Sequence, residues 1–387
     1  MKIIIAPDSF KGSLSAVEVA NAINRGVKNA YAEAETHLLP VADGGEGTME
    51  TLIAATYGEK REVVVVGPLG NEVKAAYGIL GDGETCVIEM ASASGLALVP
   101  EGKLAPLDAT TYGAGQLIKQ ALDDGFSSFI IALGGSATND GGAGMLQALG
   151  LKLLDKMGKE VGYGGGKLAD IERIDTQYFD SRIKNSKFLV ASDVQNPLIG
   201  LNGASHIFGP QKGATPDDVK ILDENMSHWA DQIATVTGVS LHDLPGAGAA
   251  GGIGGAFQAF FPAKMERGVD VVLEYVNFHG YLKNTDLVIT GEGQVDYQTA
   301  SGKTPLGVAQ AAMSENVPSI ILAGAVGKGI EILYDYGVVS VHSIVDKPMT
   351  LCESMSQAAS LLEKSAEQII RSYFYSQIKE LEGGRLI

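Results

Sequence analysis

Three glycine-rich turns carry the side chains with the clearest chemical potential in this chain. They lie at 41–48, 133–144 and 290–296, and each follows an apolar run typical of a buried strand. Glycine lets the backbone approach a ligand, and the free N–H groups at the start of a helix favour an anion. Carboxylates within such turns could bind Mg²⁺ or accept a hydroxyl proton, although any one turn could equally be a tight connection capped by Asp. Together they predict a site for a metal and a phosphorylated or polyhydroxylated ligand.

Single polar residues after other apolar runs extend this set. Asp8 and Lys11 follow the first run, where Asp8 could bind a metal or accept a proton and Lys11 could neutralise an anion. Asp193 ends another buried run and needs a partner or a metal there. Asn196 is held extended by the proline after it and could present its amide to a ligand. Lys212, between glycines in an acidic protein, is a candidate phosphate contact. The alternatives are capping and solvated side chains.

Two stretches resemble nucleotide-binding motifs only as text. Residues 246–251 match G-x-G-x-x-G but follow Leu244-Pro245 instead of a strand, which favours close packing or a ligand loop of another kind. Residues 301–304 look like the end of a P-loop, but Tyr297 stands where that motif needs glycine. Lys303 could still meet phosphate at the start of the following helix. The histidines show no paired metal spacing.

Bulk composition excludes several function classes. The formal net charge of −17 argues against nucleic acid or an anionic membrane as partner, so an anionic substrate would need local cations. The N-terminal apolar run is too short for a signal peptide, and no apolar run reaches membrane-spanning length. Cys86 and Cys352 could pair, but buried free thiols in a reducing cytosol fit better. We expect a cytoplasmic enzyme.

Hydrophobic periodicity predicts an α/β fold. The first segment alternates strand and helix, and Ser15 with Glu18 forms a capping box for its first helix. A hairpin in the middle indicates antiparallel pairing. The predicted strands are 2–6, a strand ending near 41, 62–66, 73–80, 85–90, 286–290, 319–323 and 338–344, and the predicted helices are 16–30, 48–56, 305–313 and 355–379.

Two domain layouts fit this pattern. The chain could split near residue 150 into consecutive domains, or both ends could build one domain around an insertion. Similar strand–helix grammar at the two ends favours insertion. The predicted fold is therefore a discontinuous Rossmann-like parallel-sheet domain at 1–72 and 285–387 plus an inserted mixed α/β domain at 73–284, with the active site in the cleft between them.

Six motifs, in order along the whole chain, resemble the bacterial glycerate kinase family of the type that yields 2-phosphoglycerate. They occupy 6–15, 42–48, 134–142, 193–198, 209–213 and 290–293. The resemblance implies two α/β domains, a Mg²⁺ requirement, and transfer of the ATP γ-phosphoryl group to the 2-hydroxyl of D-glycerate, with ADP as the other product. The expected partners are these small molecules alone, and the expected state is a monomer or homodimer.

The residue roles come from chemistry and not from the resemblance. Asp8 and Asp43 are candidates to accept or orient the hydroxyl proton, with Asp296 ranked below them, and Lys11 and Lys212 are candidates to offset negative charge. The catalytic candidates are Asp8, Lys11, Asp43, Asp193 and Lys212, and the metal candidates are Asp193 and Glu292. The candidates for binding substrate or nucleotide are Ser9, Gly44, Gly45, Glu46, Gly134, Gly135, Ser136, Thr138, Asn139, Asp140, Asn196, Gly291 and Lys303.

Three other functions remain open at this point. One is a kinase of the same fold acting on another small sugar acid. Another is an NAD-dependent oxidoreductase, suggested by the Rossmann-like grammar and by residues 246–251. The last is a non-enzymatic sensor of sugar acids, which would bind glycerate without consuming ATP.

Overall fold

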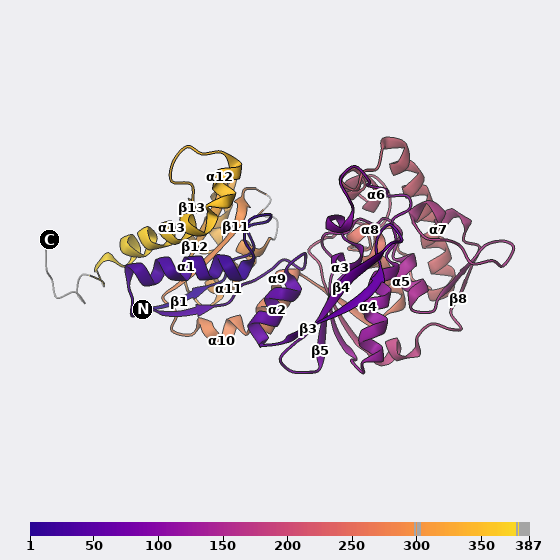
Figure 1. The fold of residues 1–387 in the computed structure, drawn as a ribbon, viewed down its shortest axis with the longest axis horizontal. Helices are drawn as coiled ribbons and strands as arrows, with labels where there is room; N and C mark the ends of the chain where they lie inside the picture. Colours follow the sequence, from indigo (N-terminus) through magenta and orange to yellow (C-terminus); the bar gives the residue numbers. More distant parts are fainter. Residues whose placement is uncertain (298, 300–302, 377, 379–387) are drawn as a thin grey trace. The chain divides into compact units, whose positions relative to one another are not determined.

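The computed structural model describes residues 1–297, 299, 303–376 and 378, and the chain forms two compact units (Figure 1). Met1–Asp43 and Val269–Ile387 make up one, called here the terminal unit, and Gly44–Gly268 make up the other, the central unit. The fold is thus α/β, with a parallel-sheet unit from both chain ends and an inserted unit with a mixed sheet. The boundaries differ from those expected, because residues 44–72 belong to the central unit and residues 269–284 to the terminal unit.

The terminal unit holds a five-stranded sheet in the order β13-β12-β11-β1-β2, and every pair in it is parallel. Its strands are β1 (Lys2–Ile5), β2 (Glu35–Leu38), β11 (Leu287–Val295), β12 (Ser319–Val326) and β13 (Val338–Ser343). Its helices are α1 (Ala16–Ala30), α9 (Gly268–Tyr275), α10 (Phe278–Leu282), α11 (Thr304–Ser314), α12 (Leu351–Ser356) and α13 (Ala358–Tyr373). The helix predicted over 355–379 is broken at Gln357, and its expected end lies outside the described residues.

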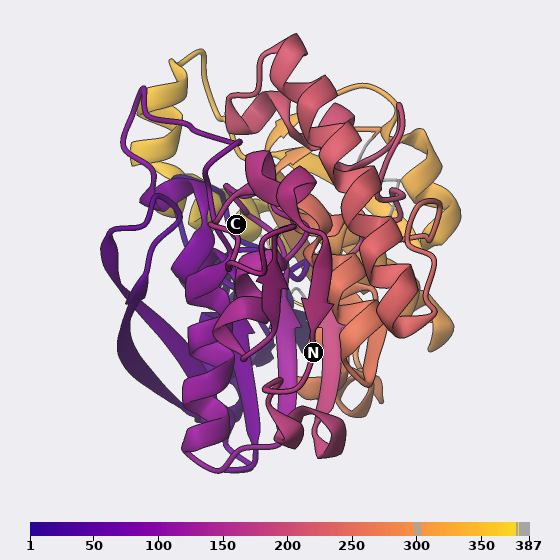
Figure 2. The same ribbon diagram turned by 90° about the vertical axis from the view of Figure 1, so that its right-hand side faces the viewer.

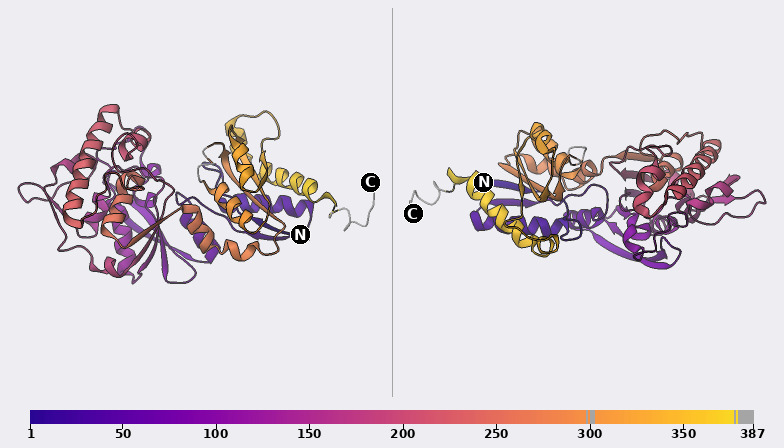
Figure 3. Two further views of the ribbon diagram at one scale, coloured as in Figure 1. Left: turned by 180° about the vertical axis from the view of Figure 1, so that it is seen from behind. Right: turned by 90° about the horizontal axis from the view of Figure 1, so that it is seen from above.

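Both faces of this sheet are covered, as alternation along β12 shows. Ile320 and Leu322 pack in the core formed with α1 and α13, whereas Ile321 packs with residues of α11. Helices α1 and α13 run side by side (Figure 3), and a Cβ on Gly26 would lie 2.1 Å from the carbonyl oxygen of Glu363. Two buried faces explain the continuous apolar character of these strands.

One predicted turn of the terminal unit is wrong. Residues 291–295 were expected to lie in a glycine-rich turn, but β11 continues through them and pairs with β12 as far as Val295. Gly291 allows this pairing, because a Cβ there would lie 2.1 Å from the carbonyl oxygen of Leu322. Cross-strand pairing thus overrides the weak strand propensity of glycine.

The central unit holds a six-stranded sheet in the order β10-β9-β6-β5-β4-β3 (Figure 2). Strands β10, β9, β6 and β5 are parallel, and β4 and β3 complete the sheet in antiparallel pairs. The strands of this sheet are β3 (Glu59–Val66), β4 (Glu72–Ile79), β5 (Thr85–Glu89), β6 (Ser128–Ala132), β9 (Lys187–Ala191) and β10 (Ala263–Glu266). A separate two-stranded antiparallel sheet consists of β7 (Lys152–Leu154) and β8 (Arg173–Asp175). Its helices are α2 (Thr48–Thr56), α3 (Ala91–Ser94), α4 (Tyr112–Asp123), α5 (Ala143–Ala148), α6 (Ala204–Phe208), α7 (Pro216–Thr237) and α8 (Ala249–Phe260).

Strand β3 corrects the expected start of the fold. It was predicted as the third parallel strand of the first domain, but it pairs antiparallel with β4 along eight register positions. The short connection from Val66 to Glu72 favours a hairpin over a parallel crossover, which needs a dozen or more residues. This strand carries residues 44–72 into the central unit.

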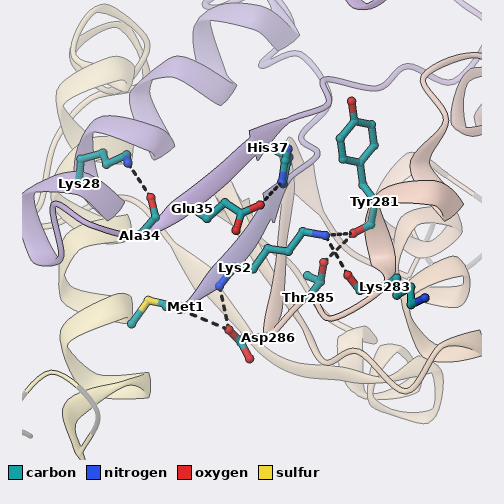
Figure 4. A network of polar contacts seen from close by, with 10 residues as sticks. All are labelled: Met1, Lys2, Lys28, Ala34, Glu35, His37, Tyr281, Lys283, Thr285 and Asp286. Carbon is teal, nitrogen blue, oxygen red and sulfur yellow. Dashed lines mark hydrogen bonds and ion pairs between the residues drawn. The ribbon is translucent and has the colours of Figure 1, made fainter. Parts of the chain in front are cut away.

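A polar network closes the amino end of the terminal sheet (Figure 4). Asp286 accepts a hydrogen bond from the Lys2 backbone N–H at 2.8 Å and lies 3.8 Å from the Met1 ammonium. The Lys2 side chain donates to the carbonyl oxygens of Tyr281 and Lys283 at 2.6 and 2.9 Å, which satisfies the end of α10. This network fixes both the N-terminus and the chain entering β11.

Two expectations about the chain as a whole have structural outcomes. Cys86 and Cys352 are both free thiols, but only Cys86 is buried, so the expectation of two buried thiols is half wrong. In the part of the chain that the structure describes, no helix combines the length and the apolar character needed to cross a bilayer.

Candidate functional site

Asp8 lies just past β1, at the carboxyl edge of the terminal sheet. Its carboxylate accepts hydrogen bonds from the Thr304 hydroxyl and from the Ser9 N–H, both at 2.6 Å. Its backbone N–H donates to the Gly291 carbonyl at 2.8 Å, which ties the loop to β11. Burial, together with the charge of Asp43, raises the pKa of Asp8 to about 7. A carboxyl group whose pKa lies near physiological pH can both accept and release a proton, which suits proton transfer.

Glu292 shares this acidic environment. Its carboxylate accepts a hydrogen bond from the Thr299 hydroxyl at 2.7 Å. Burial raises the pKa of Glu292, and the charges of Asp43 and Asp296 add to that rise while Lys303 opposes it. The charge of Glu292 in turn contributes to the raised pKa of Asp8. The charges of Asp43, Asp296 and Lys303 thus act on Glu292 within the terminal unit, and those of Asp43 and Glu292 act on Asp8, while the roles predicted for these residues stay predictions.

The other predicted residues of this unit lie near the same edge with different exposure. Lys11 is exposed, and its backbone N–H lies 3.6 Å from the position of a Cβ on Gly293. Ser9 contributes its backbone N–H to Asp8. Gly291 is part of β11, where its missing side chain serves strand pairing. Lys303 directly precedes α11, whose first residue, Thr304, bonds Asp8.

The carboxylates of the terminal unit fit a hard divalent cation, because oxygen ligands and surplus negative charge are what Mg²⁺ prefers. Among the described residues, no three Asp, Glu, His or Cys side chains converge closely enough to hold an ion by themselves. Mg²⁺ usually binds one or two carboxylates and completes its shell with water and substrate phosphates.

In the central unit two predicted glycine turns lie against each other. The Gly134 N–H donates to the Gly44 carbonyl at 3.2 Å, and a Cβ on Gly134 would lie 2.5 Å from the Cα of Gly45. Gly44 also approaches the Ala191 carbonyl, since a Cβ there would lie 2.8 Å from that oxygen. Residues 44–47 therefore pack on the carboxyl ends of β6 and β9, where open α/β sheets bind ligands.

Lys212 is the buried cation beside these turns. It lies at the end of a 3₁₀ turn (Pro210–Lys212) and is 1% exposed. Its ammonium donates to the Ser136 hydroxyl at 2.8 Å and to the Thr138 carbonyl at 2.6 Å. Burial lowers the pKa of Lys212 to about 7, and the charge of Asp140 opposes that fall. A buried ammonium whose charge burial disfavours is stabilised by a nearby anion.

Asp140 holds the shape of the 133–144 turn. Its buried carboxylate accepts hydrogen bonds from the Thr111 N–H and hydroxyl, both at 2.8 Å, and from the Gly142 and Gly144 N–H groups at 3.1 and 3.3 Å. The Asn139 amide donates to the Ser205 hydroxyl at 2.9 Å. These bonds make the turn rigid, which a binding loop requires.

Two buried oxygen atoms of this turn have no hydrogen-bond partner within the described residues. They are the hydroxyl of Thr138 and the side-chain carbonyl of Asn139, and both side chains are fully buried. Buried polar atoms normally find partners, so unsatisfied ones mark a place where a ligand or water completes the bonding. The same turn bonds Lys212 through Ser136 and Thr138, so the predicted candidates of residues 136–139 and Lys212 are neighbours in the structure.

Asp193 and Asn196 each bond a backbone group of the central unit. Asp193 is exposed instead of buried, and its carboxylate accepts from the Gly268 N–H at 3.0 Å. The Asn196 amide donates to the Asn202 carbonyl at 2.9 Å. Glu46, also predicted as a contact, is exposed on the 44–47 turn. The two predicted metal ligands fall in different units, Asp193 in the central and Glu292 in the terminal one.

The glycine stretch at 246–252 supports close packing. A Cβ on Gly251 would lie 2.1 Å from the Thr138 carbonyl, and Gly251 itself accepts from the Gly141 N–H at 3.0 Å. Ala250 takes the left-handed conformation with φ 52° to make this approach. The backbone of this stretch therefore packs directly against the 133–144 turn. This is the close packing that the sequence favoured for these small residues.

Sequence reasoning missed several residues of these sites. Thr299 and Thr304 bond the carboxylates of the terminal unit, and their only sequence signal is proximity to Lys303. Ser205 bonds Asn139 from α6, 66 positions away. Glu89 ends β5 at the carboxyl edge of the central sheet, but in sequence it is one acidic residue after an apolar run.

A parallel-sheet unit built from both chain ends, together with an inserted mixed-sheet unit, defines a two-part α/β enzyme, and comparison with known proteins agrees. The chain belongs to the glycerate kinase family, whose model matches residues 3–374. A glycerate kinase of Bacillus subtilis is 52% identical over 372 residues, which cover 96% of this chain and 97% of that protein.

Two further relatives agree. A glycerate 2-kinase of Escherichia coli K12 is 48% identical, covering 95% of this chain and 97% of its own length. A crystal structure described as a candidate glycerate kinase 2 from Salmonella typhimurium LT2 matches with a TM-score of 0.87 at 45% identity, covering 97% of this chain and 99% of that one. The resemblance predicted from the six motifs is thus confirmed, and the protein is an enzyme of this family.

Proposed function

We propose that the protein transfers the γ-phosphoryl group of ATP to the 2-hydroxyl of D-glycerate, giving 2-phosphoglycerate and ADP. The observation that carries the proposal is the near full-length match to relatives named glycerate kinase and glycerate 2-kinase. The regiochemistry rests on the second of these names. The carboxylates of the terminal unit and the buried Lys212 of the central unit supply the charges that phosphoryl transfer needs.

In the central unit, Lys212 and the 134–139 turn would bind the anionic groups. The Ser136 hydroxyl accepts from the Lys212 ammonium, so its own hydrogen can be donated to a phosphate or carboxylate beside that ammonium. The Thr138 hydroxyl is a further donor that has no protein partner among the described residues. Such fixed donors, arranged before the ligand arrives, stabilise charge that develops during transfer.

In the terminal unit, Asp8 is the first candidate to accept the proton of the substrate hydroxyl. Its pKa of about 7 and its fixed orientation by Thr304 and Ser9 support that role over Asp43 and Asp296. The transition state of phosphoryl transfer is loose, so the demand for a strong base is small. Asp8 would then orient the hydroxyl more than activate it.

Mg²⁺ is the cofactor that the proposal assigns, with Glu292 as the candidate ligand of the terminal unit and Asp193 that of the central unit. When bound, it would neutralise charge on the phosphates. The Thr299 hydroxyl orients the Glu292 carboxylate, and the Gly268 N–H orients that of Asp193.

The test is an ADP-release assay with ATP, Mg²⁺ and a panel of acceptors that contains D-glycerate, L-glycerate and longer sugar acids. The proposal predicts the highest kcat/KM with D-glycerate and no ADP without an acceptor. Preference for a longer aldonate would keep the kinase and change its substrate. ATP left intact with every acceptor, together with glycerate binding, would indicate a sensor, and reduction of NAD⁺ would indicate the oxidoreductase.

A further inference from the structure

Glu89 is a buried carboxylate that no role described above uses. It is the last residue of β5, it is 7% exposed, and it pairs in register with Ala132, the last residue of β6. The 133–144 turn starts directly after Ala132. Glu89 therefore lies at the ligand-binding edge of the central sheet, one strand away from that turn.

The carboxylate of Glu89 caps helix α2 from another element. It accepts a hydrogen bond from the Met49 N–H at 2.7 Å, and a second one comes from the Gly47 backbone. The N-cap residue of α2 is Gly47, with φ 93° and no side chain to cap the first turn. Glu89 thus satisfies backbone N–H groups that the local sequence leaves open.

This contact holds one end of the 44–47 turn, and the 133–144 turn holds the other. Gly44 accepts from the Gly134 N–H, and Gly45 packs on Gly134 without room for a side chain. Glu89 accepts hydrogen bonds from Gly47 at the end of the same turn and from Met49 in the first turn of α2. The stretch between these two attachments carries the candidate ligand contacts Gly44, Gly45 and Glu46.

The charges around Glu89 show that its burial is costly. Burial raises the pKa of Glu89 to about 7, and the charges of Glu46 and Glu50 add to that rise while the two backbone donors oppose it. The pKa of Lys60 on β3 is raised mainly by its hydrogen bond to Glu50, and the charge of Glu89 adds to that rise. Because like charges repel, the Glu89 carboxylate is unsuited to touching an anionic ligand directly.

We propose that Glu89 is a positioning residue of the phosphoryl-transfer reaction, which fixes the 44–47 turn against the 133–144 turn in the geometry that binds substrate. The inference rests on the proposed function. A cap that served only the stability of α2 would leave the kinetic constants unchanged when it is weakened.

The test compares wild-type protein with E89Q, E89A and the control E50Q. Glu50 lies on the same helix with a 57% exposed side chain paired to Lys60 at 2.6 Å, so E50Q removes one charge near Glu89 without touching the turn. In E89Q the single amide oxygen can still accept from Met49, but the amide NH₂ is no acceptor, so one neutral oxygen replaces a charged carboxylate before the two backbone donors. This variant keeps the fold while it loosens the turn, and it remains informative if E89A fails to fold.

Two readouts decide the result. Hydrogen exchange of the amides at 45–49 should be about tenfold faster in E89Q than in wild type or E50Q, because a charge-assisted hydrogen bond is lost. The KM for D-glycerate or ATP should rise about tenfold in E89Q with a smaller change in kcat, and any change of KM around pH 7 that titration of Glu89 causes should flatten.

A lowered melting temperature with unchanged exchange at 45–49 and unchanged KM would overturn the proposal. Faster exchange with unchanged KM would overturn it as well, because the turn would then move without consequence for binding. If wild type and E50Q both fail to turn over D-glycerate, the proposed function fails, and the exchange measurement still decides whether Glu89 holds the turn.

Discussion

Asp8 and Lys212 carry opposite charges in different units, yet burial moves both toward neutrality. It raises the pKa of the carboxyl to about 7 and lowers that of the ammonium to about 7. Around Asp8 the neighbouring charges of Asp43 and Glu292 have the same sign, so the terminal unit has surplus negative charge. Around Lys212 one carboxylate, Asp140, opposes the loss of its proton, and four hydrogen bonds already engage that carboxylate.

Each unit therefore holds a buried charge that a ligand of opposite charge would stabilise. A cation would relieve the repulsion around Asp8 and Glu292, and an anion would favour the protonated form of Lys212. The network at the amino end of the terminal sheet differs, because Asp286 there already lies beside the Met1 ammonium. Asp8 and Glu292 lie at the carboxyl edge of the terminal sheet and Lys212 lies beside the turn that follows β6, so these shifted pKa values occur where open α/β sheets bind ligands.

The largest effect is expected when the buried cation of the central unit is removed. K212M should lower kcat/KM for phosphoryl transfer about 100-fold or more, because it removes a preorganised cation from the anion site. Stability should change by only about 2 kcal/mol or less, since loss of the buried ammonium offsets the two acceptors left without a donor. Steady-state kinetics and denaturant unfolding measure the two effects. Near-normal kinetics would remove Lys212 from the site.

The next effect concerns the terminal unit. E292Q should raise the Mg²⁺ concentration needed for half-maximal activity by about 10-fold, because a neutral amide is a weaker ligand for a hard cation than a carboxylate. E331Q, at an exposed carboxylate of the same unit, is the matched control. A Mg²⁺ titration of the rate measures the shift, and equal titration curves for E292Q and E331Q would contradict the assignment.

A smaller effect sharpens the electrostatic argument at Asp8. Because its native pKa is raised from 3.8 to about 7, the native state keeps a proton between these values that the unfolded state has lost. This contribution to stability is therefore fully present below about pH 4 and lost as the pH rises through 7. D8N does not titrate, so its melting temperature should rise relative to wild type between pH 5 and pH 8, measured without Mg²⁺. A constant difference would show that Asp8 titrates normally.

The smallest effect is expected at Ala250, in the glycine stretch at 246–252 that packs against the 133–144 turn. Ala250 has a positive φ, so A250G should stabilise the protein by about 0.5–1 kcal/mol through relief of backbone strain, partly offset by the freedom of glycine in the unfolded chain. Thermal unfolding measures it. Destabilisation would show that the Ala250 side chain contributes packing that outweighs the strain.

Local signals in the sequence predicted much of this fold. The capping box of Ser15 and Glu18 marked the start of α1, and the structure shows both of its hydrogen bonds. The apolar runs gave most strands, and the polar residues after them gave the two groups of charges. Such features depend on neighbours within a few positions.

Features that depend on distant partners could not be predicted. Strand β11 runs through Gly291 because β12 pairs with it, and β3 joins the central sheet because β4 folds back on it. Thr304 reaches Asp8 across 296 positions, and Glu89 caps a helix 40 positions earlier. The burial that shifts the pKa values of Asp8 and Lys212 also arises only when the chain is folded.

The most direct test of the proposed phosphoryl transfer is ³¹P NMR of the purified protein with ATP, Mg²⁺ and D-glycerate. We expect the ATP signals to fall while ADP and the phosphomonoester of 2-phosphoglycerate appear in equal amounts. A 3-phosphoglycerate signal would contradict the assigned hydroxyl, and unchanged ATP would contradict the proposed reaction itself.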